Sequence, residues 1–126
     1  MPRYSQFGDV DPRGWQRAYA LEFDVPRQAA GNMEICVRHT GDFLYKELFL
    51  RVEMFGDGAT AYVDTVRVQM ADDTGRWLGK GSFGLYTLRT PLSLTLPRDS
   101  VVHVEISQAL ADDAPVGIRN LGLISE

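Results

Sequence analysis

This chain has one cysteine, two histidines and no long hydrophobic run. A single thiol excludes an internal disulfide and a cysteine-based zinc site. No apolar stretch approaches the roughly 20 residues that a membrane-spanning helix needs. Residues 1–7 lack the apolar core of a signal peptide. Lysine and arginine are scattered and the net charge is −4, so nucleic acid and anionic membrane surfaces are not indicated as partners. We expect a soluble domain.

The residues that most often carry chemistry show no catalytic pattern. His39 and His103 are not at metal-ligand spacing, and no serine sits in a nucleophile elbow. Glu34, Glu53 and Glu105 could meet across a sheet as the carboxylates of a glycoside hydrolase, but nothing singles them out from surface glutamates. We therefore predict a protein that is not an enzyme, with no catalytic residue, no cofactor and no metal ligand.

Apolar and polar residues alternate along most of the chain, which is the pattern of strands with one buried and one wet face. The apolar members are Tyr19, Leu21, Phe23 and Val25; Met33, Ile35 and Val37; Leu48, Leu50, Val52 and Met54; Val66, Val68 and Met70; Leu92, Leu94 and Leu96; Val102, Val104 and Ile106. Turn signals such as Asp72–Gly75 and Pro97–Ser100 separate the series. The pattern predicts an all-β, antiparallel β-sandwich, jelly-roll or immunoglobulin-like, of about 7–9 strands with little or no helix.

The 126 residues suit one domain. Residues 1–14 lack alternation and are expected to form an extended arm or tether, with Phe7 and Trp15 pinning it to the sandwich. Residues 15–126 are expected to form the single β-sandwich domain. Near the C-terminus, Leu121 and Leu123 are predicted to face inward, and Gly122 suits a close backbone approach or a bulge.

Asp73-Thr74-Gly75 is the tripeptide of retroviral-type aspartic proteases, small all-β homodimers in which two carboxylates share one proton. The flanking residues favour another interpretation. Asp72 before the motif and Arg76 after it are typical of a solvated hairpin turn, with Gly75 supplying a positive φ. An aspartic protease is kept only as a remote alternative.

Residues 79–84, Gly-Lys-Gly-Ser-Phe-Gly, fit a glycine-rich nucleotide loop. A dinucleotide site needs a helix directly after the glycines, and a kinase needs further motifs that this chain lacks. The sequence Leu85-Tyr86-Thr87-Leu88 that follows is strand-like. We predict that the small residues let Trp77 lie against the sheet.

Aromatic side chains offer a possible ligand face. Tyr45, Phe49, Tyr62, Trp77 and Tyr86 could line a carbohydrate- or peptide-binding surface of a sandwich, and Phe49 is predicted to point outward. The residues chosen as a possible binding or interaction surface are Phe49, Trp77, Arg38 and His39.

Several blocks, in order and spacing, resemble one family. They are Tyr4, Phe7 and Trp15 before Leu21-Glu22-Phe23; Val37–Thr40; Tyr45 and Leu48–Leu50; Asp64–Val66, Met70–Asp72 and Gly75–Gly81; and Ile106–Ala109 before Gly117-Ile118 and Leu121–Leu123. With them the chain resembles the gliding-motility-associated lipoprotein family GldH of Bacteroidetes over nearly its whole length.

The resemblance implies a role rather than a reaction. Members carry an N-terminal lipoprotein signal ending in an acylated cysteine, which this chain does not contain, and Cys36 is in the wrong context to be that residue. The expected location is the cell envelope, facing the periplasm and held to the membrane by the N-terminal lipid. The expected partners are other envelope or gliding-machinery proteins. Because relatives occur in bacteria not known to glide, the resemblance also implies a broader, secretion-linked envelope role as an alternative.

Overall fold

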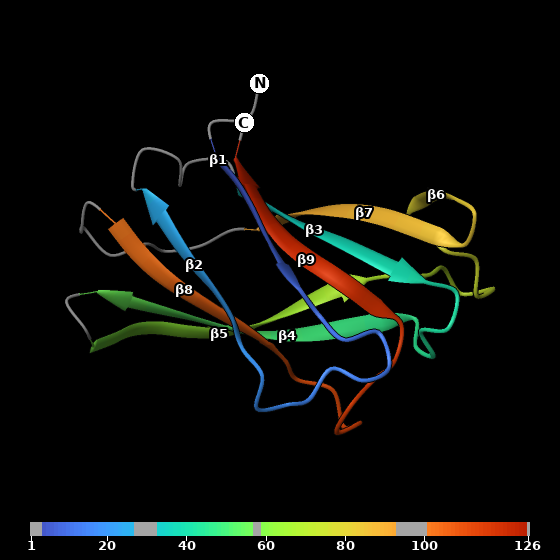
Figure 1. Cartoon of the computed structure of the whole chain (residues 1–126), viewed down its shortest axis with the longest axis horizontal. Coiled ribbons are helices and arrows are strands. Elements are labelled where there is room, and N and C mark those ends of the chain that lie inside the picture. Colours follow the sequence, from blue (N-terminus) through green and yellow to red (C-terminus); the bar gives the residue numbers. More distant parts are fainter. Residues whose placement is uncertain (1–3, 27–32, 57–58, 93–100, 126) are drawn as a thin grey trace.

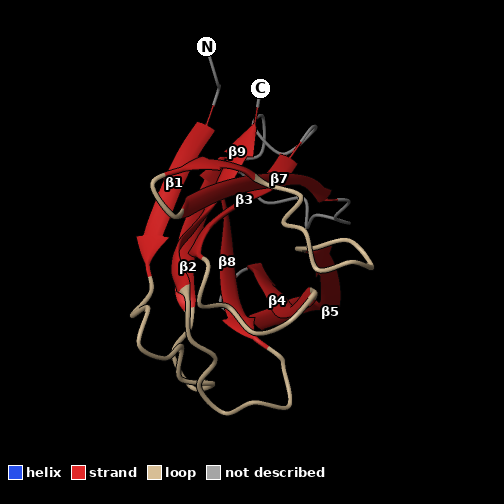
Figure 2. Cartoon of the chain, turned by 90° about the vertical axis from the view of Figure 1, so that its right-hand side faces the viewer, coloured by secondary structure: helices blue, strands red, loops and turns tan. Residues whose placement is uncertain are grey.

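A computed structural model describes residues 4–26, 33–56, 59–92 and 101–125. Within these ranges nine β-strands form two facing sheets (Figures 1 and 2). The strands are β1 (Tyr4–Asp9), β2 (Leu21–Pro26), β3 (Met33–Thr40), β4 (Glu47–Gly56), β5 (Ala59–Gln69), β6 (Lys80–Ser82), β7 (Leu85–Leu92), β8 (Val101–Gln108) and β9 (Ile118–Ser125). The described residues contain no helix, and so none that could cross a membrane.

The strand pairing is nested. β1 pairs with β9, β2 with β8, β3 with β7 and β4 with β5, all antiparallel, as in one long hairpin with its tip between β4 and β5. Two further pairings, β3 with β9 and β4 with β8, roll this hairpin into sheets of order β1-β9-β3-β7-β6 and β2-β8-β4-β5. This is a jelly roll, so the topology decides between the two predicted sandwich types.

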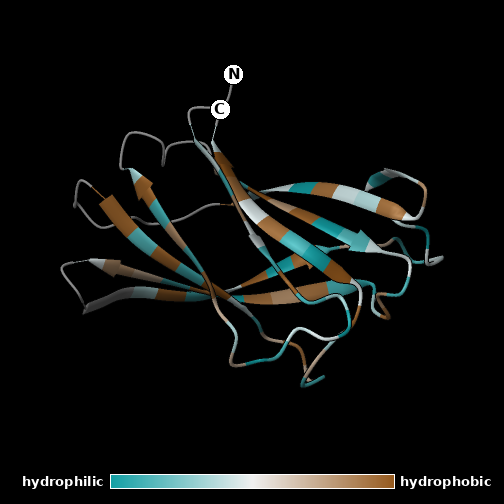
Figure 3. Ribbon diagram, viewed as in Figure 1, coloured by the Kyte–Doolittle hydropathy of each residue, from teal (hydrophilic) through white to brown (hydrophobic). Residues whose placement is uncertain are grey.

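The alternation seen in the sequence sets which side chains enter the core, and Figure 3 shows it as bands of opposite hydropathy along the strands. Leu48, Leu50, Val52 and Met54 of β4 are all buried, whereas Arg51 between them is exposed. The same holds in β2 and β8, and Leu121 and Leu123 of β9 point inward as predicted. Leu94, Leu96 and the turn at 97–100 lie outside the described residues.

The first residues are extended, as expected, but they belong to the sheet. Tyr4 to Asp9 pair with β9 in register from Tyr4↔Ser125 to Asp9↔Asn120. The alternation is weak because β1 is an edge strand that packs only part of its surface. The indole of Trp15, which follows, is fully buried and donates a hydrogen bond from Nε1 to the Tyr19 carbonyl at 2.9 Å. The backbone of the predicted arm is therefore built into the sandwich.

Candidate functional site

Four connections lie together at the end of the sandwich that is remote from the Tyr4↔Ser125 pair. They join β1 to β2, β3 to β4, β5 to β6 and β8 to β9. These connections lie together because the strand ends that they link are at the same level in the register. Side chains tie them to one another: the Tyr45 hydroxyl donates to Asp112 Oδ2 at 2.6 Å, and Lys46 Nζ donates to the Asp73 carbonyl at 2.9 Å. Arg17 Nη2 donates to the Leu110 carbonyl at 2.5 Å. We call these four connections the loop end.

The protease-like tripeptide is a turn within the loop end. Asp72 Oδ1 accepts hydrogen bonds from the backbone N–H of Thr74 at 2.9 Å and of Arg76 at 3.0 Å. Gly75 has a φ of +86°, which confirms the predicted turn glycine. The carboxylate that organises the loop is that of Asp72. The hydrogen bond that it accepts from the Thr74 hydroxyl at 2.7 Å, together with the backbone hydrogen bonds, holds its pKa below the ordinary value. Asp73 is exposed beside it.

Trp77 is partly buried against the core, as predicted for an anchor. Its ring meets the edge of His39 at 4.7 Å between centroids and lies 6.0 Å from the ring of Tyr86. The glycines after it let β6 approach β7: a Cβ at Gly79 would lie 2.9 Å from the Thr87 carbonyl oxygen, and one at Gly81 would lie 2.2 Å from that of Leu85. The glycine string is followed by a strand, so it presents no helix N-terminus to a phosphate.

His39, one of the four residues predicted to form a binding surface, has a fully buried side chain and so presents no surface to a partner. Nδ1 lies 2.9 Å from the Thr40 carbonyl and donates to it, while Nε2 has no hydrogen-bond partner among the residues that the structure describes. Tyr86 stacks on the ring at 5.4 Å. Burial lowers the pKa of the imidazole, because the charged form would lose its hydration. The alternation of Met33, Ile35 and Val37 continues to position 39 and places it on the inner face. Histidine is polar, so the sequence pattern did not indicate that it is buried.

The side chains of the other two candidate surface residues lie on the outer faces of the two sheets, whereas the His39 ring lies between the sheets. Phe49 is half-buried on the outer face of β4, opposite Arg67 of β5. Arg38 lies on the outer face of the other sheet, with its guanidinium 4.5 Å from the centre of the Phe7 ring. Of the four chosen residues, only Trp77 and His39 are therefore in contact.

Residues Phe83 and Gly84 form the tip of the β6–β7 hairpin. Ser82 pairs with Leu85, and the two residues between them both have positive φ, +55° and +78°. This is the pattern of a type I′ turn, in which asparagine or glycine is usual and phenylalanine is strained. The Phe83 side chain is fully exposed, and Leu78 and Leu85 beside the hairpin are also exposed. The hairpin tip thus presents apolar surface at the loop end.

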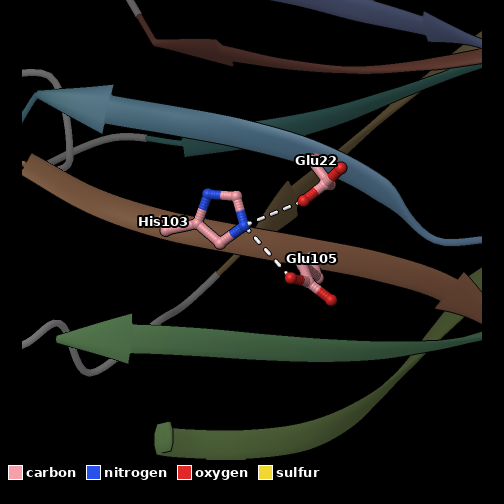
Figure 4. Close-up of side chains that lie close together, drawn as sticks. All are labelled: Glu22, His103 and Glu105. Carbon is pink, nitrogen blue, oxygen red and sulfur yellow. Dashed lines mark hydrogen bonds and ion pairs between the residues drawn. The ribbon is translucent and has the colours of Figure 1, made fainter. Parts of the chain in front are cut away.

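A second polar cluster lies on the outer face of the sheet β2-β8-β4-β5 (Figure 4). His103 Nε2 is 3.1 Å from Glu105 Oε2 and 3.3 Å from Glu22 Oε1, and its Nδ1 is 2.9 Å from Asp24 Oδ1. The strand register produces this arrangement, because Glu22 pairs with Glu105 and Asp24 pairs with His103. The hydrogen bond to Asp24, together with the other carboxylates, raises the pKa of His103. We call these four residues the His103 cluster.

The cluster differs from the set of carboxylates that the sequence suggested could meet across a sheet, namely Glu34, Glu53 and Glu105. Glu53 and Glu105 do lie directly opposite each other on β4 and β8. Glu34, however, is on the other sheet and forms an ion pair with Arg89 at 3.2 Å. Glu22 takes its place beside Glu105, and only the β2–β8 register could have indicated this.

The topology and surface define an all-β domain of the jelly-roll class that bears a carboxylate–histidine cluster on one face and an apolar hairpin tip at one end. The family model described as GldH lipoprotein matches residues 3–124, so the chain belongs to the GldH lipoprotein family. No curated protein sequence matches it.

Among solved structures, the chain is similar to the crystal structure of the infectious bursal disease virus VP2 subviral particle. The identity is 13%, the TM-score is 0.38, and the match covers 100% of this chain and 34% of that one. A structure of the infectious bursal disease virus Gt strain matches at 14% identity and a TM-score of 0.30, covering 98% and 30%. The chain spans about a third of the length of these viral chains.

Proposed function

We propose that this chain is the envelope domain of a lipoprotein that acts through protein–protein contacts rather than by catalysis, in gliding motility or a related envelope or secretion machinery. Membership of the GldH lipoprotein family supports the envelope setting and membrane attachment through an N-terminal lipid, with the domain facing the periplasm. The partners would be other proteins of that machinery.

The observation that carries the proposal is Phe83. A fully exposed phenylalanine with a φ of +55° combines backbone strain with exposed apolar surface. Neither feature stabilises the free domain, and strained residues of this kind cluster at functional sites. Aromatic residues, phenylalanine among them, are also enriched at protein–protein interfaces. The hairpin tip points away from the end where Tyr4 pairs with Ser125, so a domain held by its N-terminus presents Phe83 to a partner.

The test is capture of partners from envelope extracts of the source bacterium under mild solubilisation. Wild-type bait is compared with Phe83→Asn, which suits the turn, and with Val101→Asn, a matched loss of an exposed apolar side chain on another strand. We expect the same specific proteins with wild type and Val101→Asn, and their loss with Phe83→Asn. A monomer without partners, or equal capture by all three, would argue against the proposal.

A carbohydrate- or peptide-binding module is the second candidate. Tyr45 and Trp77 line one groove at the loop end, with the buried Phe43 beneath them, and exposed aromatic rings can stack on sugars and apolar side chains. Tyr45 is exposed and Leu44 beside it is strongly exposed. Titration with envelope glycans and peptides, followed by NMR, would show shifts confined to this groove. Shifts spread over the molecule, or none, would exclude the module.

A further inference from the structure

The His103 cluster has the composition and the spacing of a metal site. We propose that Glu22, His103 and Glu105 bind a divalent transition-metal ion of the Zn²⁺ type, with Asp24 as a positioning residue that orients the imidazole. This inference is independent of the proposed function and assigns a second role to a different face of the domain.

The distances between the ligand atoms agree with one shared ion. At Zn–N and Zn–O bond lengths of about 2.0–2.2 Å, two ligands of one ion lie roughly 2.9 Å apart at a right angle and 3.4 Å apart at the tetrahedral angle. The distances from Nε2 to the carboxylates of Glu105 and Glu22 are 3.1 and 3.3 Å, and all three ligand atoms lie within 4.8 Å of one another. A small rotation of the exposed Glu22 side chain would bring its carboxylate to a similar distance from the carboxylate of Glu105. One imidazole proton can serve only one of these two carboxylates well, whereas an ion serves both.

Asp24 supplies the outer contact that such sites use. Metal-bound histidines usually donate their other ring N–H to a carboxylate, which fixes the tautomer and raises the basicity of the ligating nitrogen. With Nδ1 donating to Asp24 Oδ1 at 2.9 Å, the lone pair of Nε2 is directed toward Glu22 and Glu105. The hydrogen bond crosses from β2 to β8, so the sheet itself holds the imidazole in this orientation.

The charges around the cluster also favour a cation. Glu22, Glu105 and Glu53 form a row directly opposite one another on β2, β8 and β4. Like charges opposed in this way destabilise a sheet, and a dication offsets the repulsion. Arg51 pairs with Glu53 at the far end of the row, leaving the other two carboxylates to the ion. The imidazole nitrogen selects a transition metal over Ca²⁺ or Mg²⁺, which prefer oxygen ligands alone.

The test uses tag-free protein that has been stripped of metal with a chelator and titrated with zinc chloride by calorimetry. We expect one Zn²⁺ per chain, loss of this binding in His103→Gln and in Glu105→Gln, and a loss of roughly 10–100-fold in affinity in Asp24→Asn. Asp73→Asn removes an exposed carboxylate at the loop end, and this variant is expected to bind as wild type does. The substituted side chains are on the outer face, and thermal unfolding confirms that each variant is folded.

The ¹⁵N resonances of the two imidazoles give a second readout. They distinguish coordination of the ion by Nε2 from nonspecific attraction of the ion to the carboxylates. Zn²⁺ should shift Nε2 of His103 while Nδ1 keeps its proton, and His39 should stay unchanged. Absence of binding, or binding that persists in His103→Gln, would overturn the proposal. Equal affinities for Ca²⁺ and Zn²⁺ would also overturn the proposal. They would show that the carboxylates alone bind the ion and that His103 is not a ligand.

Discussion

The ring of Phe7 lies directly over Gly122, its partner in the β1–β9 pairing, so that a Cβ built on Gly122 would come within 2.5 Å of the phenyl carbons. Aromatic residues often cover glycines in neighbouring strands in this way. The Arg38 guanidinium stacks on the ring, and Cys36, which pairs with Gly122 from the other side, is buried although it faces outward. This contact explains why a segment with no alternation holds to the sheet.

Gly122→Ala should therefore destabilise the domain by about 1–3 kcal/mol, because the new methyl group must displace the ring from β9. The measurement is urea unfolding followed by tryptophan fluorescence. In a Phe7→Ala background the same substitution should be neutral or stabilising, since alanine is better than glycine within a strand. An equal effect of Gly122→Ala in both backgrounds would show that the ring does not restrict this position.

Leu50 and Arg51 test the assignment of the two faces of β4. Leu50→Ala should lower the free energy of unfolding by about 2–5 kcal/mol, because it leaves a cavity in a fully buried position. Arg51→Ala, one residue away, removes a half-exposed ion pair with Glu53 and should change the stability by no more than about 0.5 kcal/mol. Both are measured by chemical denaturation. Similar losses in the two variants would contradict the observed register.

Phe83→Asn should stabilise the free domain by roughly 0.5–1 kcal/mol, since asparagine adopts a positive φ more readily than phenylalanine. Thermal unfolding gives the direction and size of the change. Phe83→Ala is the control: it removes the ring but keeps a side chain that is strained at this φ, so it should not gain stability. A variant that is more stable yet fails to capture partners would show that Phe83 serves the interaction and not folding.

The two histidines should affect stability on opposite sides of pH 6.5, their usual pKa. The folded pKa of His39 is lowered, so its contribution is present above the unfolded value and is lost as the pH falls below about 6.5. The folded pKa of His103 is raised, so its contribution is complete below that value and is lost as the pH rises through the folded pKa.

Urea unfolding from about pH 5 to pH 8 in the presence of a chelator measures both effects. His103→Gln should flatten the upper part of the profile, and it should lower the stability below pH 6.5 by a constant amount without changing the slope there. Because the chain has no third histidine, the remaining fall in stability just below pH 6.5 would belong to His39. A profile that rises as the pH falls through this range would contradict the burial of a neutral His39.

Alternation along the chain could predict which residues of β4 and β8 are buried, because the two faces of a strand are a local property. It could not predict β6, whose three residues are all exposed, or β1, on which the ring of Phe7 packs over a glycine of the neighbouring strand. The His103 cluster was missed for another reason. Asp24 and His103 are 79 residues apart, and only the pairing of β2 with β8 brings them together. The turn at Asp72–Gly75 and the Trp77 anchor were predicted because their signals lie within a few residues of one another.

The nested pairing has a mechanical consequence. β1 runs from the N-terminal end of the sandwich toward the loop end, and its hydrogen bonds to β9 lie across that direction. If the domain is held at its N-terminus and pulled at the loop end, the force acts along β1, and the β1–β9 ladder is loaded in shear. All of its bonds then resist together instead of breaking one after another. The packing of Phe7 over Gly122 adds side-chain contacts to the same strand pair. The β1–β9 pair is therefore strengthened where a domain held at its N-terminus would resist a pulling force.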